Sequence, residues 1–290
     1  MTDVGVPAVV GVIGLGNMGA ALAANLVGSD LDVLTHDLAG PERSPVGATF
    51  VGDVAAIARG ADVVVLSLPD GSVSEQVAGE IAGAADRRTA HVVDTSTVGV
   101  AAARSIEAVL AGAGVGYVDA PVSGGVAGAR ARTLSVMVAG SEPACAAVEP
   151  VLAGLSDVRR RVGDRPGMAQ ALKLANNFLS ATALAATSEA IAFGLAVGLE
   201  MGTMLDVLDA SSGRSAATSD KFPNHVLTGR YASGFANSLM AKDLRLYLGA
   251  VEAHGRPAEV GRVTAAVWER FAAAEPGADF TRVFPFVESG

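Results

Sequence analysis

Two polar side chains with catalytic potential lie in the most apolar part of the sequence. Between Gly167 and Gly194 the only charged residues are Lys173 and Glu189, and proline is absent. Lys173 and Asn177 are four residues apart, so on a helix their side chains share one face. An ammonium group in apolar surroundings is costly unless it has a partner. The pair therefore predicts either a lysine whose amine reaches water beside a capping amide, or a catalytic pair that faces a cleft.

A glycine-rich motif near the amino terminus predicts a site for phosphate groups. An apolar run over residues 9–13 is followed by Gly14-Leu15-Gly16-Asn17-Met18-Gly19, and residues 20–27 suit a helix. Between a strand and a helix this spacing is typical of dinucleotide binding. The first glycine permits the turn, the second lets the backbone approach the pyrophosphate, and the third lets the helix pack on the strand. An ordinary glycine turn is the alternative, and the flanking elements favour the dinucleotide site.

An acidic residue at the end of the second expected strand, residues 32–35, bears on the choice of cofactor. Asp37 lies about 20 residues beyond the glycines, where a carboxylate can bind the ribose hydroxyls of NAD. Its charge would repel the 2′-phosphate of NADP, so NAD is favoured. Arg43 nearby leaves NADP possible, and a plain loop aspartate is the alternative.

A third group of residues, Ser123-Gly124-Gly125, can bind an anion. Successive backbone amides exposed by two glycines form an anion-binding nest, and the serine hydroxyl can add a hydrogen bond. An ordinary loop is the alternative, and these three residues alone favour it.

The elements that carry these groups alternate between strands and helices in the first part of the chain. Further strands are expected at residues 62–68, 91–94, 116–120, 134–140 and 159–163, with helices at 55–59, 73–84, 100–112 and 143–152. This alternation predicts a parallel sheet with right-handed crossovers. Ligands of such sheets bind at the carboxyl ends of the strands, so the segments that follow Ile13, Thr35, Leu68, Asp94 and Ala120 should line one cleft.

The second part of the chain is expected to be all-helical. Residues 167–194 are rich in Ala and Leu, which predicts one long helix, and its apolar residues on nearly every face predict that it is buried all round. Polar residues interrupt it, so no membrane partner is expected. Other helices are expected at residues 201–210, 219–226, 237–254 and 257–274, with a loop-like tail from Pro276. The predicted domains are residues 1–165, which bind NAD(P), and residues 166–290, for substrate binding and oligomerisation.

Composition restricts the partners and the compartment. The 290-residue chain has a net charge of -9, which argues against a nucleic-acid partner and allows a small anionic substrate at a local positive site. Cys145 is the only cysteine, so a reducing compartment is expected, and we predict a cytoplasmic protein. The four histidines have no metal-ligand spacing, and residues 1–6 lack the features of a signal peptide.

Four blocks, in this order, resemble the β-hydroxyacid dehydrogenase family, which includes 3-hydroxyisobutyrate dehydrogenase and tartronate semialdehyde reductase. They are residues 11–19, 119–125, 173–177 and Lys242-Asp243-Leu244. The resemblance implies an α/β fold with a Rossmann-type doubly wound parallel sheet, followed by an all-α domain like that of 6-phosphogluconate dehydrogenase and joined by a long helix. It also implies an oligomer built through the helices, and the expected burial of the apolar long helix predicts a homodimer or a homotetramer. Without the resemblance, Lys242-Asp243 would be interpreted as a charge pair on a helix surface.

The resemblance assigns roles to residues by position. Lys173 resembles the catalytic lysine, Asn177 resembles its neighbour that orients the substrate, and Ser123 with the amides of Gly124 and Gly125 resembles the carboxylate-binding loop. The residues at the positions of the family's cofactor contacts are Leu68, Pro69, Thr97, Lys242 and Phe235. The chain departs from the family at Arg132 and Ala169, where glycine is usual, and at Val73, where a polar cofactor contact is frequent. These departures concern the substrate more than the fold.

The hypothesis that follows is hydride transfer between NAD(P) and a small 3-hydroxy acid such as 3-hydroxyisobutyrate. Lys173 would take the hydroxyl proton if desolvation and the nicotinamide cation lower the pKa of its amine. An NADPH-dependent reductase of small aldehyde acids, including tartronate semialdehyde or a sulfonated analogue, is one alternative. An imine reductase is another, although such members usually lack the lysine. A nucleotide sensor without catalysis is the third.

Overall fold

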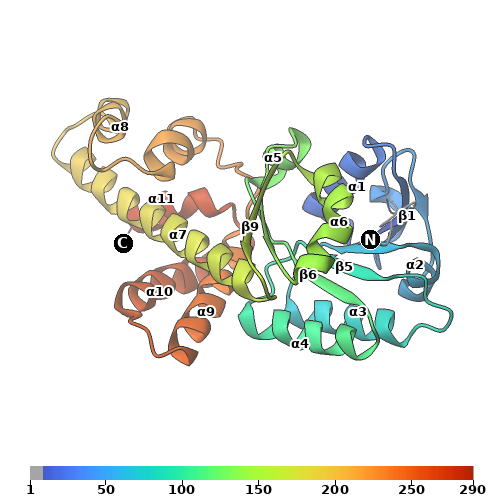
Figure 1. Ribbon diagram of the computed structural model, residues 1–290. Helices are drawn as coiled ribbons and strands as arrows, with labels where there is room; N and C mark the ends of the chain where they lie inside the picture. The colour runs from blue at the N-terminus through green and yellow to red at the C-terminus, as the bar shows by residue number, and fades with distance from the viewer. Residues whose placement is uncertain (1–8, 290) are drawn as a thin grey trace. The chain divides into compact units, whose positions relative to one another are not determined.

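The structure, a computed structural model, describes residues 9–289 and divides into two compact units between Lys173 and Leu174 (Figure 1). Residues 1–6, where the sequence shows no signal peptide, lie outside the described part. Unit 1 ends within the helix that carries Lys173, and unit 2 contains the rest of that helix.

Unit 1 is built on a sheet with the strand order β3-β2-β1-β4-β5-β6-β8-β7, and β9 pairs with β8. The pairs from β3 to β6 are all parallel, as predicted, whereas β8 runs antiparallel to β6 and β7. The strands are β1 Val9–Ile13, β2 Asp32–His36, β3 Thr49–Phe50, β4 Val63–Leu66, β5 His91–Asp94, β6 Gly116–Asp119, β7 Val122–Ser123, β8 Ser135–Ala139 and β9 Val158–Gly163. The first six follow the order of a Rossmann-type sheet.

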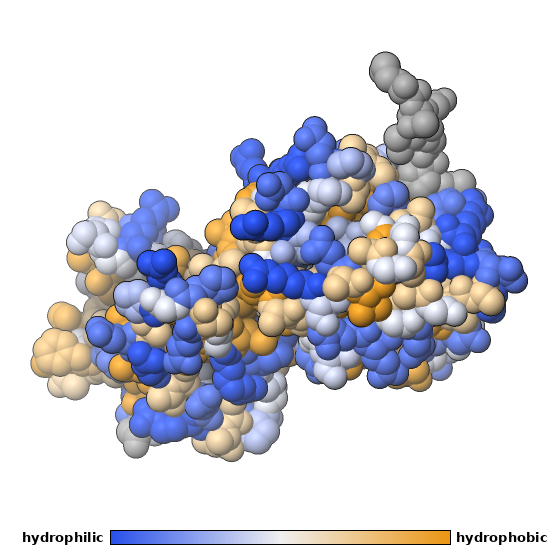
Figure 2. Space-filling model, turned by 60° about the horizontal axis from the view of Figure 1, so that its bottom comes forward, coloured by the Kyte–Doolittle hydropathy of each residue, from blue (hydrophilic) through white to orange (hydrophobic). Residues whose placement is uncertain are grey.

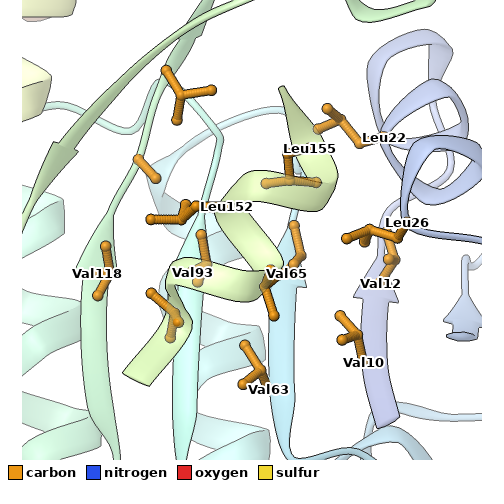
Figure 3. Close-up of a cluster of buried hydrophobic side chains, with 14 of the residues drawn as sticks. Val10, Val12, Leu22, Leu26, Val63, Val65, Val93, Val118, Leu152 and Leu155 are labelled. Carbon is orange, nitrogen blue, oxygen red and sulfur yellow. The ribbon is translucent and has the colours of Figure 1, made fainter. Parts of the chain in front are cut away.

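Alternate residues of each strand enter one of two cores, because successive side chains of a strand point to opposite faces. Val63 and Val65 pack towards α1 and α6 with the valines of β1, β5 and β6 (Figure 3). Val64 and Leu66 pack towards α2, α3 and α4. The helices of this unit are α1 Asn17–Val27, α2 Val54–Gly60, α3 Gly71–Gly83, α4 Val100–Gly112, α5 Gly125–Arg130 and α6 Glu142–Leu155, with the short η1 Pro41–Arg43. Both faces are covered, which explains why the central strands β1 and β4 contain no polar side chains.

Unit 2 is helical and has one core around Trp268, Phe222 and Phe271. Within the described residues, the named strands end with β9. The helices are α7 Met168–Ala196, which begins in unit 1, then α8 Met201–Asp209, η2 Ala217–Val226, α9 Asn237–Ala253, α10 Glu259–Ala274, η3 Phe280–Arg282 and α11 Val283–Glu288. The predicted loop-like tail is wrong, because η3 and α11 bury Phe280, Val283 and Phe284 in this core. The tail is helical, although it contains Pro285, because the rings of Phe280 and Phe284 are buried in this core.

The long helix α7 was expected to be buried all round, and this prediction is wrong. Ala181, Leu184 and Ile191 are buried, but Leu179 is 64% exposed and Phe193 is 71% exposed. Figure 2 shows one face of the molecule, on which hydrophobic side chains (orange) reach the surface among hydrophilic ones (blue). With 29 residues, α7 is long and apolar enough to cross a membrane, but core helices of soluble proteins meet the same criterion. The expectation of no membrane partner stays a prediction.

Candidate active site

The three glycines of the turn between β1 and α1 differ in what a side chain at each position would meet. Gly14 has a φ of 92°, and a Cβ there would lie 2.3 Å from the carbonyl oxygen of Ser67. A Cβ on Gly19 would lie 1.9 Å from the carbonyl oxygen of Gly14. A Cβ on Gly16, however, would meet nothing within 4 Å. The chain itself therefore requires Gly14 and Gly19, while Gly16 faces open space that a ligand can approach.

Asp37 lies against this turn, as its predicted role requires. One carboxylate oxygen accepts a hydrogen bond from the amide of Leu15, and the other accepts one from the amide of Ala39 at 2.7 Å. A carboxylate has about four acceptor sites, so both oxygens can still accept a bond from a ribose hydroxyl. Asp37 thus shapes the turn and presents a negative charge beside it.

A groove of about 520 Å³ runs along α1 from the glycine turn. It is lined by Gly16, Asn17, Ala20, Ala21, Ala24, Asn25, Arg43 and Arg130. Two guanidinium groups and the amino end of α1 make this groove favourable for a negatively charged ligand. Arg130, on α5, gave no signal in the sequence because its distance from the glycines along the chain is long.

The segments after β4 and β5 meet at the carboxyl edge of the sheet. The amide of Leu68 donates to the Ser96 hydroxyl at 2.8 Å, and the carbonyl of Leu66 accepts from the Thr95 hydroxyl at 2.6 Å. Pro69 follows Leu68, and Thr97 follows Ser96 and is half-buried. The structure therefore brings together three residues that the sequence predicted as cofactor contacts.

The loop after β6 has the backbone that an anion-binding nest needs. Ser123 ends β7, is half-buried, and pairs with Ser135 of β8. Gly124 and Gly125 have φ values of 134° and 66°, a region that side chains disfavour. Both glycines are exposed, so their amides are accessible to a small anion. The backbone conformation therefore favours glycine at both positions, and the missing side chains leave the loop open to a ligand.

Lys173 is 8% exposed and lies near the beginning of α7. That beginning is attached to the end of β6, because Asp119 accepts hydrogen bonds from the amides of Gly167 at 2.9 Å and Gln170 at 3.1 Å. The side chain of Gln170 donates to the other oxygen of Asp119 at 2.7 Å. The sequence analysis did not identify Gln170 and Asp119 as site residues, although a glutamine in an apolar segment was a usable signal.

Two buried carboxylates lie at this edge of the sheet. Asp94 and Asp119 are partners in the register of β5 and β6. Burial raises the pKa of each to about 6, and the charge of Asp119 adds to the rise at Asp94. The pKa of Tyr117 is raised well above its usual value, mainly by burial and then by the two carboxylates. Because the unfolded chain ionises these groups at lower pH than the folded one, they lower the stability of the fold as the pH rises from their ordinary pKa of 3.8 to about 6.

In unit 2, Asn177 is held by a residue that the sequence analysis did not select. Its amide nitrogen donates to Asp243 at 2.6 Å, and its oxygen accepts from Asn176 at 3.1 Å. Lys242 lies 3.4 Å from the same carboxylate of Asp243. The interpretation of Lys242-Asp243 as a surface charge pair is wrong, because Asp243 is 2% exposed. The burial of the Asp243 carboxylate among apolar residues is compensated by the amide of Asn177 and the ammonium group of Lys242.

Phe235 belongs to the aromatic core of unit 2. Its ring meets the ring of Phe280 edge to face at 5.6 Å, and its carbonyl accepts from the amide of Phe280 at 2.8 Å. A role beside the nicotinamide stays a prediction.

Comparisons with known proteins agree with this architecture. Residues 9–163 match the model described as the NAD binding domain of 6-phosphogluconate dehydrogenase, and residues 167–287 match the NAD-binding model of NADP-dependent 3-hydroxyisobutyrate dehydrogenase. A probable 3-hydroxyisobutyrate dehydrogenase of Mycobacterium tuberculosis is 36% identical over 281 residues, 93% of this chain and 95% of that protein. A 2-(hydroxymethyl)glutarate dehydrogenase of Eubacterium barkeri is 34% identical over 82% of this chain and 81% of its own length.

A solved structure of the Mycobacterium tuberculosis 3-hydroxyisobutyrate dehydrogenase with L-serine superposes with a TM-score of 0.89 and 33% identity, over 97% of this chain and 99% of that one. Both matched models describe NAD-binding domains of dehydrogenases, and both relatives are named as dehydrogenases of hydroxy acids. The chain therefore belongs to the β-hydroxyacid dehydrogenase family and is an NAD(P)-dependent hydroxyacid dehydrogenase.

Proposed function

We propose that the protein oxidises the primary alcohol of a small 3-hydroxy carboxylate to its semialdehyde, with Lys173 as the general acid/base and NAD as the preferred cofactor. The observation that carries this proposal is the buried Lys173 on a helix whose first turn is hydrogen-bonded to the carboxyl edge of the sheet. Ligands of such sheets bind at that edge. A buried amine near this edge of the sheet can take the proton of a substrate that binds there.

The substrate class follows from the chemistry in the names of the relatives. 3-Hydroxyisobutyrate, 2-(hydroxymethyl)glutarate and L-serine all contain a hydroxymethyl group on the carbon next to a carboxylate. They differ in the third substituent of that carbon, which is a methyl, a carboxyethyl or an ammonium group. We therefore assign the class HOCH2–CH(R)–COO⁻ to this chain, with a 3-hydroxyisobutyrate-like R group as the first candidate.

The residues of the chain have separate tasks in this reaction. The amides of Gly124 and Gly125, with the Ser123 hydroxyl, bind the carboxylate, since the loop presents the backbone of an anion nest. Lys173 in its neutral form accepts the hydroxyl proton during oxidation and returns it during reduction. Asn177, one helical turn further along α7, orients the alcohol and is itself held by Asp243. When bound along Gly16, Leu68, Pro69 and Thr97, the nicotinamide cofactor supplies the hydride acceptor.

The test is a substrate panel with purified protein and both cofactors. We expect reduction of NAD with 3-hydroxyisobutyrate, 3-hydroxypropionate or L-serine, with one of them preferred. Isobutanol, which lacks the carboxylate, should have a kcat/KM lower on the order of 10⁴-fold, because a site built for a polar group rejects the analogue without it. Cofactor binding without turnover of any hydroxy acid would instead support a nucleotide sensor.

The cofactor preference gives a separate prediction. Asp37→Asn keeps an acceptor for the Leu15 amide and removes the charge that repels a 2′-phosphate. The ratio of kcat/KM for NAD to that for NADP should fall at least about tenfold, which corresponds to 1.4 kcal/mol. Arg43→Ala is the opposing variant, because it removes a guanidinium from the groove beside Gly16 and should weaken NADP alone. An unchanged ratio in Asp37→Asn would show that Asp37 only shapes the turn.

The second candidate function is an NADPH-dependent reductase of small aldehyde acids. The observation in its favour is the pair of arginines in the groove, which suits an additional phosphate. Steady-state turnover of tartronate semialdehyde with NADPH, compared with oxidation of 3-hydroxyisobutyrate with NAD, separates the two directions. We also place the protein in the cytoplasm as a homodimer or a larger homo-oligomer, without a nucleic-acid or membrane partner.

The exposed stripe of α7 supports self-association. It comprises the exposed Asn176, Leu179, Ala186, Ala190 and Phe193 and the half-buried Ala183, at intervals of three and four residues. This spacing is that of a coiled-coil seam, and the stripe contains no charge. The intervals read the same in both directions, so two antiparallel copies can match large residues with small ones across a two-fold axis.

Glutamates at both large positions of the stripe should separate the subunits. We expect Leu179→Glu combined with Phe193→Glu to give a monomer, because each carboxylate would be buried in the seam without a partner. Light scattering coupled to size-exclusion chromatography measures the mass. Val46→Glu, at a position 99% exposed in unit 1, is the control and should keep the oligomer. An unchanged mass in the double variant would assign the interface to another surface.

A further inference from the structure

We propose that Gln170 is a positioning residue, which fixes the helix that carries Lys173 against the segments that hold cofactor and substrate. The inference rests on the proposed role of Lys173 as the acid/base. Gln170 itself does not take part in proton transfer, because an amide is not a base at physiological pH.

The side chain of Gln170 is fully buried and uses its whole hydrogen-bonding capacity. Its oxygen accepts from the amides of Val98 at 2.9 Å and Gly99 at 3.0 Å. Its nitrogen donates to the carbonyl of Ser96 at 3.0 Å and to Asp119 at 2.7 Å. A primary amide has two donors and two acceptor lone pairs, so all four are satisfied. A buried side chain held by four bonds has one orientation.

The partners of Gln170 belong to two separate walls of the predicted cleft. Ser96 and Val98 flank Thr97. The Ser96 hydroxyl also accepts a hydrogen bond from the amide of Leu68, so the hydrogen-bond network of Gln170 extends to the segment after β4. Asp119 ends β6 and begins the loop that leads to Ser123. One amide thus connects the cofactor-binding segments, the substrate-binding loop and α7.

Lys173 lies three residues after Gln170 on the same helix, so the two side chains lie on neighbouring parts of one face. The first turn of α7 cannot rotate or slide without breaking the bonds of Gln170 and those of Asp119 to the amides of Gly167 and Gln170. A displacement of about 1 Å in a reacting group can cost about 10²-fold in rate. The position of the amine along the helix is therefore set by Gln170 and Asp119 rather than by the apolar contacts of α7.

The first experiment uses Gln170→Met, which has nearly the same volume and no hydrogen-bonding amide. We expect kcat to fall about 10²-fold, as for a misplaced reacting group, while the Kd of NAD, measured by calorimetry, changes less than about threefold. KM for the hydroxy acid should change much less than kcat. The deuterium isotope effect on kcat should increase, because hydride transfer becomes rate-limiting.

The matched control is Thr89→Val. Thr89 is buried before β5, and its hydroxyl lies 3.1 Å from the carbonyl oxygen of Ala58 and 3.0 Å from that of Ala61. This variant also removes a buried hydrogen bond from unit 1, at the amino edge of the sheet. It should lower Tm without changing kcat or the isotope effect. If Gln170→Met behaves like this control, Gln170 is merely structural and the inference is overturned.

A second variant, Gln170→Glu, uses pH as the readout. A carboxylate replaces the amide 2.7 Å from Asp119, and two carboxylates this close cannot both ionise, so they share a proton at low pH. The ionisable groups around them are Asp94 on β5, Tyr117 on β6 and Arg104 of α4, beside Gly167. These groups are present in both proteins, so the ratio reports the effect of the introduced carboxylate, including its effect on the pKa of Asp119 and Asp94. We expect the ratio of kcat in the variant to kcat in the wild type, measured for reduction, to rise at least about tenfold from pH 8 to pH 5.

The outcomes separate this inference from the proposed function. Suppose that Lys173→Met abolishes turnover, that Gln170→Met has normal turnover, and that the ratio for Gln170→Glu does not depend on pH. The inference then fails and the proposed function stands. If Lys173→Met keeps turnover, the proposed function fails first. Should Gln170→Met not fold, the pH dependence of Gln170→Glu alone decides, and a flat ratio overturns the inference.

Discussion

Lys173→Met is expected to lower kcat for hydroxy-acid oxidation by about 10³-fold at pH 8, within the range of general acid–base catalysis. Methionine matches the length of lysine, so packing at this buried position is kept while the proton acceptor is lost. The Kd of NAD should change less than about threefold, because the residues predicted to bind the cofactor are all elsewhere. Initial rates of NADH formation and calorimetric binding give the two values.

Two controls make the Lys173 result specific. Lys221→Met removes a lysine that is paired with Asp220 at 2.6 Å in unit 2, and its kcat should equal that of the wild type. In Lys173→Ala, a small primary amine added to the solution should restore part of the activity, because it can occupy the vacated space and carry the proton. A kcat within tenfold of the wild type in Lys173→Met would contradict the assignment of the acid/base.

Gly16→Val is expected to weaken cofactor binding by more than about 10²-fold, or 2.7 kcal/mol, without unfolding the protein. A Cβ on Gly16 would meet no protein atom within 4 Å, so we expect the fold to tolerate a side chain there. The same side chain fills the space through which a pyrophosphate must approach the backbone. NADH fluorescence titration measures the Kd, and thermal unfolding without cofactor tests the fold.

Two other glycines serve as controls for Gly16→Val. Gly52 also faces open space and lies outside the turn, so Gly52→Val should bind NADH normally. Gly19→Val should instead destabilise the protein itself, because its Cβ would lie 1.9 Å from a carbonyl oxygen. Normal NADH binding by Gly16→Val would mean that the dinucleotide does not cross this turn.

Local patterns in the sequence predicted most strands, most helices and the glycine turn correctly. Val63 to Leu66 is uniformly apolar because the strand is buried on both faces, and such a run is readable without knowing its neighbours. The very short β3 and β7 and the six-residue α5 were not predicted, since none of them is long enough to show a period. The helical tail was missed because its burial depends on rings from η2 and α10.

Long-range pairing explains what the sequence did not reveal about the site. Gln170 and Asp119 are 51 residues apart, and Asn177 and Asp243 are 66 apart, so no local pattern connects them. The burial of α7 was overestimated because an apolar face predicts contact but not whether the contact lies within one chain. Arg132 stands where glycine is usual with a φ of 58°, and its guanidinium bonds to the carbonyls of Ala153 and Gly154 offset that conformation. Such compensation is visible only in three dimensions.

The single tryptophan offers a spectroscopic consequence. Trp268 is buried in unit 2 and donates to the carbonyl of Ala181 on α7 at 3.2 Å, whereas the glycine turn is in unit 1. Its intrinsic emission therefore monitors the helical half, while the fluorescence of NADH, which we propose binds at the turn, monitors the other half. Because α7 is common to both, denaturant titrations followed at the two wavelengths reveal whether the halves melt together or in sequence.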